Sequence, residues 1–250
     1  MGSGLSDVVV VTGAVGGLGR VYSVALAQAG CSVVVADIAD PSGVVGEIEA
    51  AGGSALGLRV DVTDRSSTEQ MAHRTLERYG RIDALVNNAA YYTSIVKKPF
   101  EELGDDEWDR CFAVNVRGAW LCSRAVAPAM KERARGKIVN VSSMTVPTAP
   151  PGFAHYISSK AAIVGLTRAL ARELGPYGIN VNTLTPDYIA FDRDYDNRQP
   201  DMAPVLASQR AFPREQQPQD MVGTLLYLIG PGSDFVTGQN VWVNGGRAFQ

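Results

Sequence analysis

The sequence predicts an α/β fold consisting of a single doubly wound, Rossmann-like domain, in which a seven-stranded parallel sheet carries helices on both faces. Short runs rich in Val and Ile alternate with longer helical segments, as they do in βαβ units. No linker or change of composition divides the 250 residues, so residues 1–250 are expected to form one domain. A glycine cluster between Gly13 and Gly19 follows the first apolar run and opens the first helical segment.

The strands are expected in the β-branched runs, which are apolar almost throughout because a parallel strand is buried on both faces. Their ranges are 7–12, 32–36, 55–60, 84–87, 137–142, 180–184 and 240–243. The helices are expected in the longer segments between these strands. Their ranges are 18–29, 42–51, 66–79, 106–131, 156–174 and 220–229.

Residues 186–218 interrupt the alternation of strands and helices. Prolines recur there, strand periodicity disappears, and charged residues mix with aromatic ones. Long loops in compact domains are usually lids or binding loops. We therefore expect a substrate loop with short helical pieces in this segment.

Composition and charge argue against several classes of protein. The net charge is -3 and no basic run is present, so nucleic-acid binding is not expected. No apolar run approaches the ~18 residues of a membrane span, and the start lacks the layout of a signal peptide. Cys31, Cys111 and Cys122 lie far apart, which suits a reduced, cytoplasmic compartment. His73 and His155 complete no Cys/His cluster with zinc-ligand spacing, so no metal is expected.

The glycine cluster has the spacing and the context of a dinucleotide-binding turn. It reads Thr12-Gly-Ala-Val-Gly-Gly-Leu-Gly19, between a predicted strand and a predicted helix. Gly13 allows the tight turn, and the later glycines leave room for a pyrophosphate and for close packing of the helix. We expect the cofactor contacts of this turn to come from Gly13, Gly17, Leu18 and Gly19.

The end of the second predicted strand indicates which dinucleotide is bound. Asp37 lies about twenty residues past the glycines, where a carboxylate can accept hydrogen bonds from both ribose hydroxyls and would repel a 2′-phosphate. No arginine or lysine stands beside it or at Val15 and Gly16, so NAD is favoured over NADP. A capping role for Asp37 is the alternative. Further cofactor contacts are expected at the ends of the next two strands, from Asp61, Val62 and Asn88.

A possible proton-transfer site lies in the second half of the chain. Tyr156 and Lys160 are four residues apart, so both side chains lie on one face of a helix, and Ser143 closes the strand before it. A phenol with a pKa of about 10 is a poor acid or base near neutrality, but a neighbouring ammonium group stabilises its phenolate. A surface pair is the alternative for an isolated Tyr-x-x-x-Lys match.

Taken together, these residues resemble the classical short-chain dehydrogenase/reductase family, from about residue 8 to residue 246. The matching elements are the glycine motif, Asp61, Asn87-Asn88-Ala89, Asn115, Ser143, Tyr156-Ile-Ser-Ser-Lys160, Pro186 and Asn244-Gly-Gly246. The resemblance implies a doubly wound domain, a nicotinamide cofactor and homo-oligomers, commonly tetramers or dimers. It also implies that the subunits meet through helices 106–131 and 156–174.

The same resemblance implies a catalytic tetrad of Asn115, Ser143, Tyr156 and Lys160. Tyr156 would exchange a proton with the substrate oxygen while hydride moves between the substrate carbon and the nicotinamide ring. Lys160 would lower the pKa of Tyr156 and bind the nicotinamide ribose. Ser143 would orient the substrate oxygen, and Asn115 would hold a water of a proton relay.

The sequence departs from the family pattern at three positions. Ala90 replaces a glycine after the fourth strand, Asp187 replaces the glycine after Pro186, and Phe191 replaces a threonine. We expect Asp187 to place a carboxylate near the mouth of the site, and Phe191 to supply a ring and no hydrogen bond. Backbone groups near Ile189 are expected to hold the nicotinamide carboxamide.

The residues around this site favour a small apolar or aromatic substrate. Candidate pocket walls are Tyr91, Tyr92, Phe153, Tyr188, Phe191, Tyr195 and Phe212. His155 is expected to be a wall or surface residue and not a base, because it points about 100° away from Tyr156 on a helix. Arg193 and Arg198 leave open the alternative of a substrate that carries a carboxylate, sulfonate or phosphate group.

The expected function is NAD-dependent interconversion of a secondary, benzylic or ring alcohol and its carbonyl compound. One alternative is an NADP-linked reductase of 3-oxoacyl groups or sugars. Residues 187–213 hold five aspartates against three arginines, which would repel an acidic carrier protein. Another alternative, of a different class, is a non-catalytic NAD-binding regulatory protein.

Overall fold

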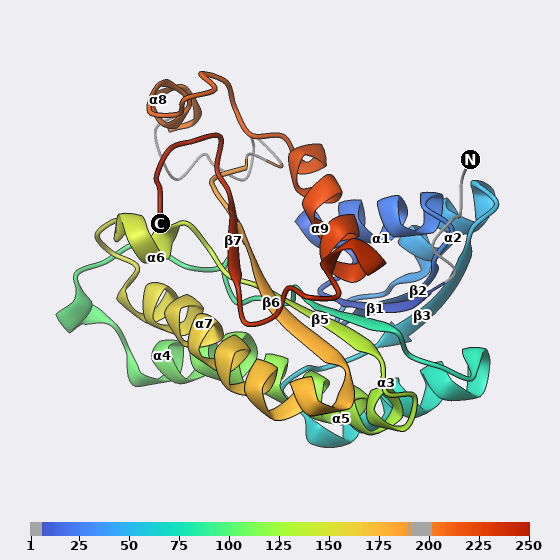
Figure 1. Cartoon of the computed structure of the whole chain (residues 1–250). Coiled ribbons are helices and arrows are strands. Elements are labelled where there is room, and N and C mark those ends of the chain that lie inside the picture. Colours follow the sequence, from blue (N-terminus) through green and yellow to red (C-terminus); the bar gives the residue numbers. More distant parts are fainter. Residues whose placement is uncertain (1–6, 190, 192–201) are drawn as a thin grey trace.

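The computed structural model describes residues 7–189, 191 and 202–250. It contains one seven-stranded sheet in the order β3-β2-β1-β4-β5-β6-β7, and every neighbouring pair of strands is parallel (Figure 1). The predicted fold class is therefore confirmed. The chain runs outward in opposite directions from β1, so the switch point of the sheet lies between β1 and β4. In sheets of this kind ligands bind outside the carboxyl ends of the strands at that point.

All seven strands form where the β-branched runs predict them. They are β1 (Val8–Thr12), β2 (Ser32–Asp37), β3 (Ser54–Arg59), β4 (Ala84–Asn87), β5 (Gly136–Val141), β6 (Ile179–Pro186) and β7 (Asn240–Val243). The largest difference is in β6, which extends beyond residue 184. Its last residues, Thr185 and Pro186, pair in register with Trp242 and Val243 of β7, and this partner strand lies more than fifty residues further along the chain.

Two layers of helices cover the sheet, and the strand sequences explain why both faces are buried. Helices α1 (Gly17–Gln28), α2 (Ser42–Ala50) and α9 (Val222–Ile229) lie on one face, and α3 (Arg65–Tyr79), α5 (Ala119–Glu132) and α7 (Ala154–Leu174) lie on the other (Figure 1). In β1, Val9 and Val11 belong to the core under the first layer, whereas Val10 belongs to the core under the second. The uninterrupted valines of this strand therefore serve both cores.

The predicted helix 106–131 is divided in the structure. Helix α4 (Asp105–Phe112) passes into a π-helical turn, η2 (Ala113–Gly118), before α5 begins. A π-helical turn is wider than an α-helical one, and such turns are frequent at functional sites. Apolar periodicity did not predict this interruption, which contains Asn115.

The segment 186–218 contains short helical pieces, as predicted. Helix α8 (Ala203–Ser208) lies within it, and the 3-10 helix η4 (Pro218–Met221) begins at its end. A further short helix, α6 (Thr145–Thr148), follows β5. Residues 190 and 192–201 lie outside the described part of the chain.

Candidate active site

The glycine turn joins β1 to α1 and faces the switch point of the sheet. Gly13 has a φ of 62°, and a Cβ there would lie 2.7 Å from the Cα of Ala89 on the neighbouring strand connection. A Cβ on Gly19 would overlap the carbonyl oxygen of Gly13. Only glycine fits these two positions, because one needs a left-handed conformation and the other packs directly on the backbone.

The outer side of this turn has room for a ligand. A Cβ on Gly16 would meet no atom within 4 Å. Gly16 occupies the N-cap position of α1, and no side chain accepts a hydrogen bond from the first amides of the helix there. The first turn of α1 contains no acidic residue. An uncapped helix N-terminus attracts anions, since its free amides and the helix dipole both favour negative charge. These residues therefore fit the pyrophosphate of a dinucleotide.

Asn88, directly after β4, holds the glycine turn in place by hydrogen bonds. Its side-chain amide donates to the carbonyl oxygens of Thr12, at 3.1 Å, and Gly13, at 2.9 Å. The Thr12 hydroxyl accepts in return from the backbone amides of Asn88 and Ala89, both at 3.1 Å. The structure thus brings together the two segments predicted to bind the cofactor, and it gives Asn88 a supporting role within the turn.

Two acidic residues predicted to contact the cofactor also lie at this edge of the sheet. Asp37 accepts hydrogen bonds from the backbone amides of Val15 and Ala39, both at 2.9 Å, so its carboxylate is held beside the glycine turn. Asp61 lies just after β3, and one of its carboxylate oxygens accepts from the amide and the hydroxyl of Thr63. Each of these bonds fixes the orientation of a carboxylate without using all of its acceptor positions.

Sequence reasoning missed a basic residue close to Asp37. Arg59, the last residue of β3, is the register partner of Asp37 in the sheet. No sequence signal connects the two, because they are 22 residues apart and become neighbours only through strand pairing.

Ser143, Tyr156 and Lys160 meet where β5 ends and α7 begins. Tyr156 lies in the first turn of α7 and is buried. Lys160 is also buried, lies with its Nζ 5.8 Å from the centre of the Tyr156 ring, and donates to the carbonyl oxygen of Val141 at 2.8 Å. The Ser143 hydroxyl accepts from both the amide, at 3.2 Å, and the hydroxyl of Thr145, at 3.0 Å. Its own proton is therefore available to another acceptor.

The electrostatics of this group differ from one part of the prediction. Burial raises the pKa of Tyr156 above its ordinary value, the nearby Tyr92 raises it further, and a hydrogen bond with Ser143 lowers it. Lys160 was expected to lower the pKa of Tyr156, but it makes no resolved contribution to that pKa in this structure. Burial lowers the pKa of Lys160 itself to about 8. The physical reason is desolvation, which penalises both charged forms inside the protein.

Asn115 occupies the π-helical turn, and its side chain is fully engaged. Its carbonyl oxygen accepts from the Tyr91 amide at 2.6 Å, and its amide nitrogen donates to the Ser159 hydroxyl at 2.9 Å. A weaker contact of 3.4 Å reaches the Cys111 sulfur. The Ser159 hydroxyl in turn donates to the backbone oxygen of Tyr156 at 2.7 Å. Asn115 is thereby connected to the helix that carries Tyr156 and Lys160.

Ser159 and Thr145 are supporting residues that sequence reasoning missed. Each reaches a predicted catalytic residue through a single hydroxyl group, Ser159 through the Tyr156 backbone and Thr145 through Ser143. The available signal was position alone, since one precedes Lys160 and the other follows Ser143 by two residues.

The loop after β6 corrects the prediction made for Asp187. Its side chain is only 2% exposed and forms ion pairs with Arg210 and Arg247, so it does not present a carboxylate at the mouth of the site. The sequence could not show this, because the two arginines are 23 and 60 residues away. Ile189 packs against the core under α1, and the Phe191 ring approaches the glycine turn, lying 4.0 Å from a Cβ built on Gly17.

The aromatic residues predicted as pocket walls are distributed unevenly. Tyr92 and Phe153 lie against Tyr156, with ring centres 5.0 and 6.2 Å away, and Tyr91 packs in the same cluster. Phe212 is 70% exposed. The remaining candidates include Tyr195, which lies outside the described residues together with Arg193 and Arg198.

His155 was expected to be either a pocket wall or a surface residue, and the structure shows that it is not on the surface. It is completely buried beside Tyr156, and its Nε2 lies 3.9 Å from the carboxylate of Glu107 in α4. Burial lowers its pKa, although Glu107 acts in the opposite direction. The side chain takes part in the packing of α4 on α7.

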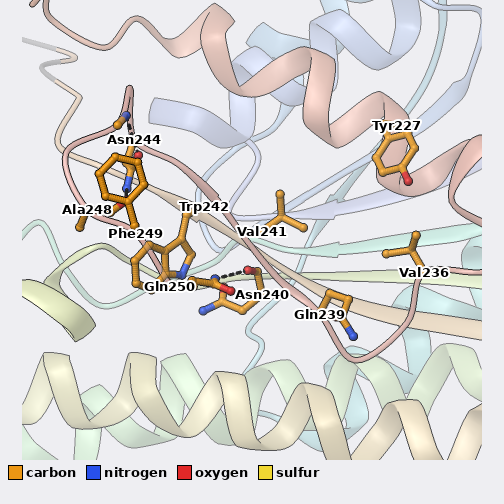
Figure 2. A pocket seen from close by; sticks show the side chains of 11 residues that line it. Tyr227, Val236, Gln239, Asn240, Val241, Trp242, Asn244, Ala248, Phe249 and Gln250 are labelled. Atoms are coloured by element: carbon orange, nitrogen blue, oxygen red, sulfur yellow. Dashed lines mark hydrogen bonds between the residues drawn. The ribbon is translucent and has the colours of Figure 1, made fainter. Parts of the chain in front are cut away.

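An open hollow of about 610 Å³ lies elsewhere, along β7 and the C-terminal segment. Figure 2 shows its lining, which includes Asn240, Trp242, Phe249 and Gln250. None of the four predicted catalytic residues lines it. The candidate site is therefore defined by the chemistry gathered around Tyr156 and not by the size of a cavity.

Among the described residues, no three or more His, Cys, Asp or Glu side chains lie close enough together to hold a metal ion. Within the same part of the chain, no helix is long and apolar enough to cross a membrane. Cys31, Cys111 and Cys122 are all free and buried.

Known proteins with similar sequences and structures are dehydrogenases and reductases. A family model described as enoyl-(acyl carrier protein) reductase matches residues 13–248. The (2S)-[(R)-hydroxy(phenyl)methyl]succinyl-CoA dehydrogenase subunit BbsD of Thauera aromatica is 36% identical over 244 residues, which is 96% of each chain. Cyclopentanol dehydrogenase of Comamonas sp. is 36% identical and is covered to 98%, as is this chain.

A solved structure extends the likeness to three dimensions. It is that of a Beutenbergia cavernae protein assigned as an NAD(P)-dependent gluconate 5-dehydrogenase, with NADP bound at low occupancy. The two chains are 35% identical, superpose with a TM-score of 0.88, and cover 99% of each other.

Proposed function

The chain belongs to the classical short-chain dehydrogenase/reductase family, and on this basis we propose that it is an NAD-dependent dehydrogenase that interconverts a secondary, benzylic or ring alcohol and its carbonyl compound. One observation carries the proposal. Ser143, Tyr156 and Lys160 lie together at the carboxyl end of β5, on the edge of the sheet that also bears the open glycine turn. Proton transfer and dinucleotide binding are thus provided for at one edge of one sheet.

In this proposal, Tyr156 takes the proton of the substrate hydroxyl during oxidation and returns it during reduction. The bound nicotinamide ring supplies the hydride acceptor or donor. Ser143 donates its hydroxyl proton to the substrate oxygen, since its own oxygen already accepts from Thr145. Because the pKa of Lys160 is about 8, its ammonium group is still mostly charged at pH 7 and favours the phenolate of Tyr156 once substrate and cofactor have displaced water.

Lys160 and Asn115 have supporting roles. Lys160 is assigned to the nicotinamide ribose, because two of its N–H groups would be available for the ribose while the third stays on the Val141 oxygen. The side chain of Asn115 is already engaged with Tyr91 and Ser159. A water of the proton relay is therefore assigned to its backbone carbonyl group and not to its amide.

The preference for NAD rests on Asp37. Its carboxylate is oriented by two backbone amides beside the glycine turn and retains acceptor positions for ribose hydroxyls. A 2′-phosphate at the same place would add negative charge next to this carboxylate. The other cofactor contacts are assigned as predicted from the sequence, to Gly13, Gly17, Leu18, Gly19, Asp61, Val62, Asn88 and Ile189.

An apolar or aromatic substrate is supported by the rings around the catalytic phenol. Tyr92 and Phe153 flank Tyr156, and Tyr91 lies in the same cluster. The dehydrogenases of Thauera and Comamonas act, by their names, on a phenyl-bearing and a cyclic alcohol.

A reduced, cytoplasmic setting is also proposed, because the three cysteines are free and buried.

The direct test is a screen for NADH formation over secondary, benzylic and cyclic alcohols, sugars and hydroxy acids. Tyr156→Phe serves as the blank, since it keeps the ring and removes the exchangeable proton. We expect one alcohol class to give turnover that falls at least ~10³-fold in the blank. Equal activity of the two proteins would reject the mechanism.

A second candidate, NADP-linked reduction of a 3-oxoacyl group or a sugar, is favoured by two observations. Arg59 pairs in register with Asp37, and the Beutenbergia protein was solved with NADP. Oxidation of NADPH by acetoacetyl thioesters or ketoses, faster than oxidation of NADH, would support this candidate.

A further inference from the structure

Asp187 forms a buried ion-pair network directly after β6, at the position where the sequence departs from the family pattern. One carboxylate oxygen accepts from Nε of Arg210 at 3.1 Å and from its Nη2 at 2.9 Å. The other accepts from Nη1 of Arg247 at 2.7 Å. Both oxygens of one carboxylate are therefore used by two guanidinium groups.

The network joins three segments that are distant in the sequence. Arg210 follows α8, and its guanidinium group also donates to the backbone oxygens of Tyr188 and Arg214. Arg247 follows the Asn244-Gly-Gly246 turn near the C-terminus, and its Nε donates to the Gln209 side chain at 3.2 Å. The start of the substrate loop, the end of α8 and the C-terminal segment are thus held by one carboxylate.

A neutral side chain reinforces the same junction. The Gln216 oxygen accepts from the backbone amide of Asp187 at 3.1 Å, and its amide nitrogen donates to the Val243 oxygen of β7 at 2.8 Å. Gln216 is itself buried. Consequently both the backbone and the side chain of Asp187 are fixed in position.

The energetics indicate a role in geometry more than in net stability. The side chains of Asp187 and Arg210 are 2% and 3% exposed, so both charges lose their hydration when the pair forms. The attraction between the two charges does little more than offset this desolvation cost. Buried ion pairs contribute little stability compared with apolar packing, whereas loss of one partner leaves an unpaired buried charge. The three segments can keep all of these bonds in only one arrangement, because any other arrangement would leave a buried charge without its partner.

The fixed position of Asp187 has consequences on both sides of the site. On one side, the preceding Pro186 oxygen accepts from the amide of Met144, the residue next to Ser143. On the other, Ile189 packs on the core under α1 and Phe191 reaches the glycine turn near Gly17. A shift of Asp187 would therefore be passed to Ser143 through Met144, and to Ile189 and Phe191 beside the glycine turn.

We propose that Asp187 is a positioning residue that, through Arg210 and Arg247, fixes Ile189 and Phe191 beside the glycine turn of the cofactor site. This inference rests on the proposed nicotinamide-linked function and deepens it. The residues that contact the cofactor would be Ile189 and Phe191, and the ion-pair network would determine where they lie.

The test measures NADH binding by fluorescence titration, together with the KM for NAD and kcat. Asp187→Asn keeps the shape and one acceptor oxygen but removes the charge. We expect its Kd for NADH and its KM for NAD to rise about tenfold, with a smaller fall in kcat from the shift passed to Ser143 through Met144. Asp220→Asn is the matched control, because it removes the charge from the exposed ion pair of Asp220 with Arg214, which lies four residues after Arg210. This control should leave both constants within twofold of the wild-type protein.

Two further measurements keep the result interpretable. Arg247→Gln leaves the pair of Asp187 with Arg210 intact, so it should give a smaller rise in the Kd for NADH, and its combination with Asp187→Asn should be non-additive. If Asp187→Asn and Arg247→Gln both bind NADH within twofold of the wild type, the positioning role is overturned. If the wild-type protein binds neither NADH nor NADPH, the proposed function itself fails.

Discussion

Asn115 and Ser159 are joined by a hydrogen bond of 2.9 Å that links the π-helical turn to the helix carrying Tyr156 and Lys160. Ser159 passes this link to the backbone oxygen of Tyr156 at 2.7 Å. The position of the Tyr156 side chain, proposed above as the acid/base, therefore depends on the buried hydroxyl group of Ser159.

Ser159→Ala should lower kcat about tenfold with little change in KM, because Asn115 loses its strongest side-chain acceptor and the start of α7 is released. The buried Asn115 amide keeps only its weaker contacts with Cys111 and Tyr91, so the free energy of unfolding should also fall by about 1 kcal/mol. Steady-state kinetics and urea denaturation measure the two effects. Ser158→Ala, one position earlier on the same helix, is the control. If kcat of Ser159→Ala equals that of the control, the link is only structural.

The pH dependence of alcohol oxidation should follow the buried phenol. Burial raises the pKa of Tyr156, so its reactive phenolate is scarce near neutrality. For oxidation, kcat/KM should therefore rise with pH from about pH 6 to about pH 8. Above that range the rise should flatten, since Lys160, with a pKa of about 8, then loses the charge that is proposed to favour the phenolate in the complex with substrate and cofactor. A flat profile below pH 8 in the rate of NADH formation would contradict this assignment.

Thr145→Val should weaken the control of Ser143 over the substrate oxygen. The variant removes the hydroxyl that donates to Ser143 at 3.0 Å and keeps the backbone amide bond. We expect kcat to fall about three- to tenfold and stability to change by less than about 1 kcal/mol. Thr145→Ser should restore the rate. Thr148→Val, in the same short helix but bonded to Met144, should behave like the wild-type protein.

Asp37→Ser tests the cofactor preference. Loss of the carboxylate should reduce kcat/KM with NAD about 10- to 100-fold, since a charged acceptor of ribose hydroxyls contributes about 1.5–3 kcal/mol. With NADP, kcat/KM should rise, because Arg59 on the neighbouring strand can then attract the 2′-phosphate. The ratio of the two values is the measured quantity. An unchanged ratio would show that Asp37 only caps the backbone of Val15 and Ala39.

The assembly of the protein can be tested on the outer side of α4 and α5. Trp108 and Trp120 are about 40% exposed, at 39% and 42%, and Trp108 stacks on Phe112. Exposed aromatic side chains of this kind are enriched at interfaces. We expect a tetramer or dimer by light scattering, and a smaller species for Trp120→Glu. Trp120→Phe should keep the wild-type size. A monomeric wild-type protein would refute the assembly.

The part of the fold that follows from local sequence was predicted well. The seven strands and the covering helices were predictable because β-branched runs and apolar periodicity act over a few residues. The glycine turn and the Tyr156–Lys160 spacing were predictable for the same reason, since each lies within one short segment. The family assignment follows from these local motifs and is confirmed by the relatives.

What was missed depends on contacts between distant segments. Asp187 was expected at the mouth of the site, but its partners Arg210 and Arg247 are brought to it only by the folded loop and the C-terminal segment. The pKa of Tyr156 was judged from the neighbouring lysine, whereas burial, a property of the whole fold, has the larger effect. The π-helical turn around Asn115 also has no periodic signature in the sequence.

Because the π-helical turn lies between α4 and α5, the number of residues in it determines how the two helices are oriented relative to each other. A π-helical turn accommodates one residue more than an α-helical turn. Deleting a single residue between Ala113 and Gly118 would either replace the wide turn by an α-helical one, which displaces Asn115, or keep the wide turn and rotate α5 by about 100° relative to α4. In the second case the apolar face of α5 would leave the sheet. Insertions and deletions here should therefore be tolerated far less than substitutions, and libraries that vary the site should keep its length fixed.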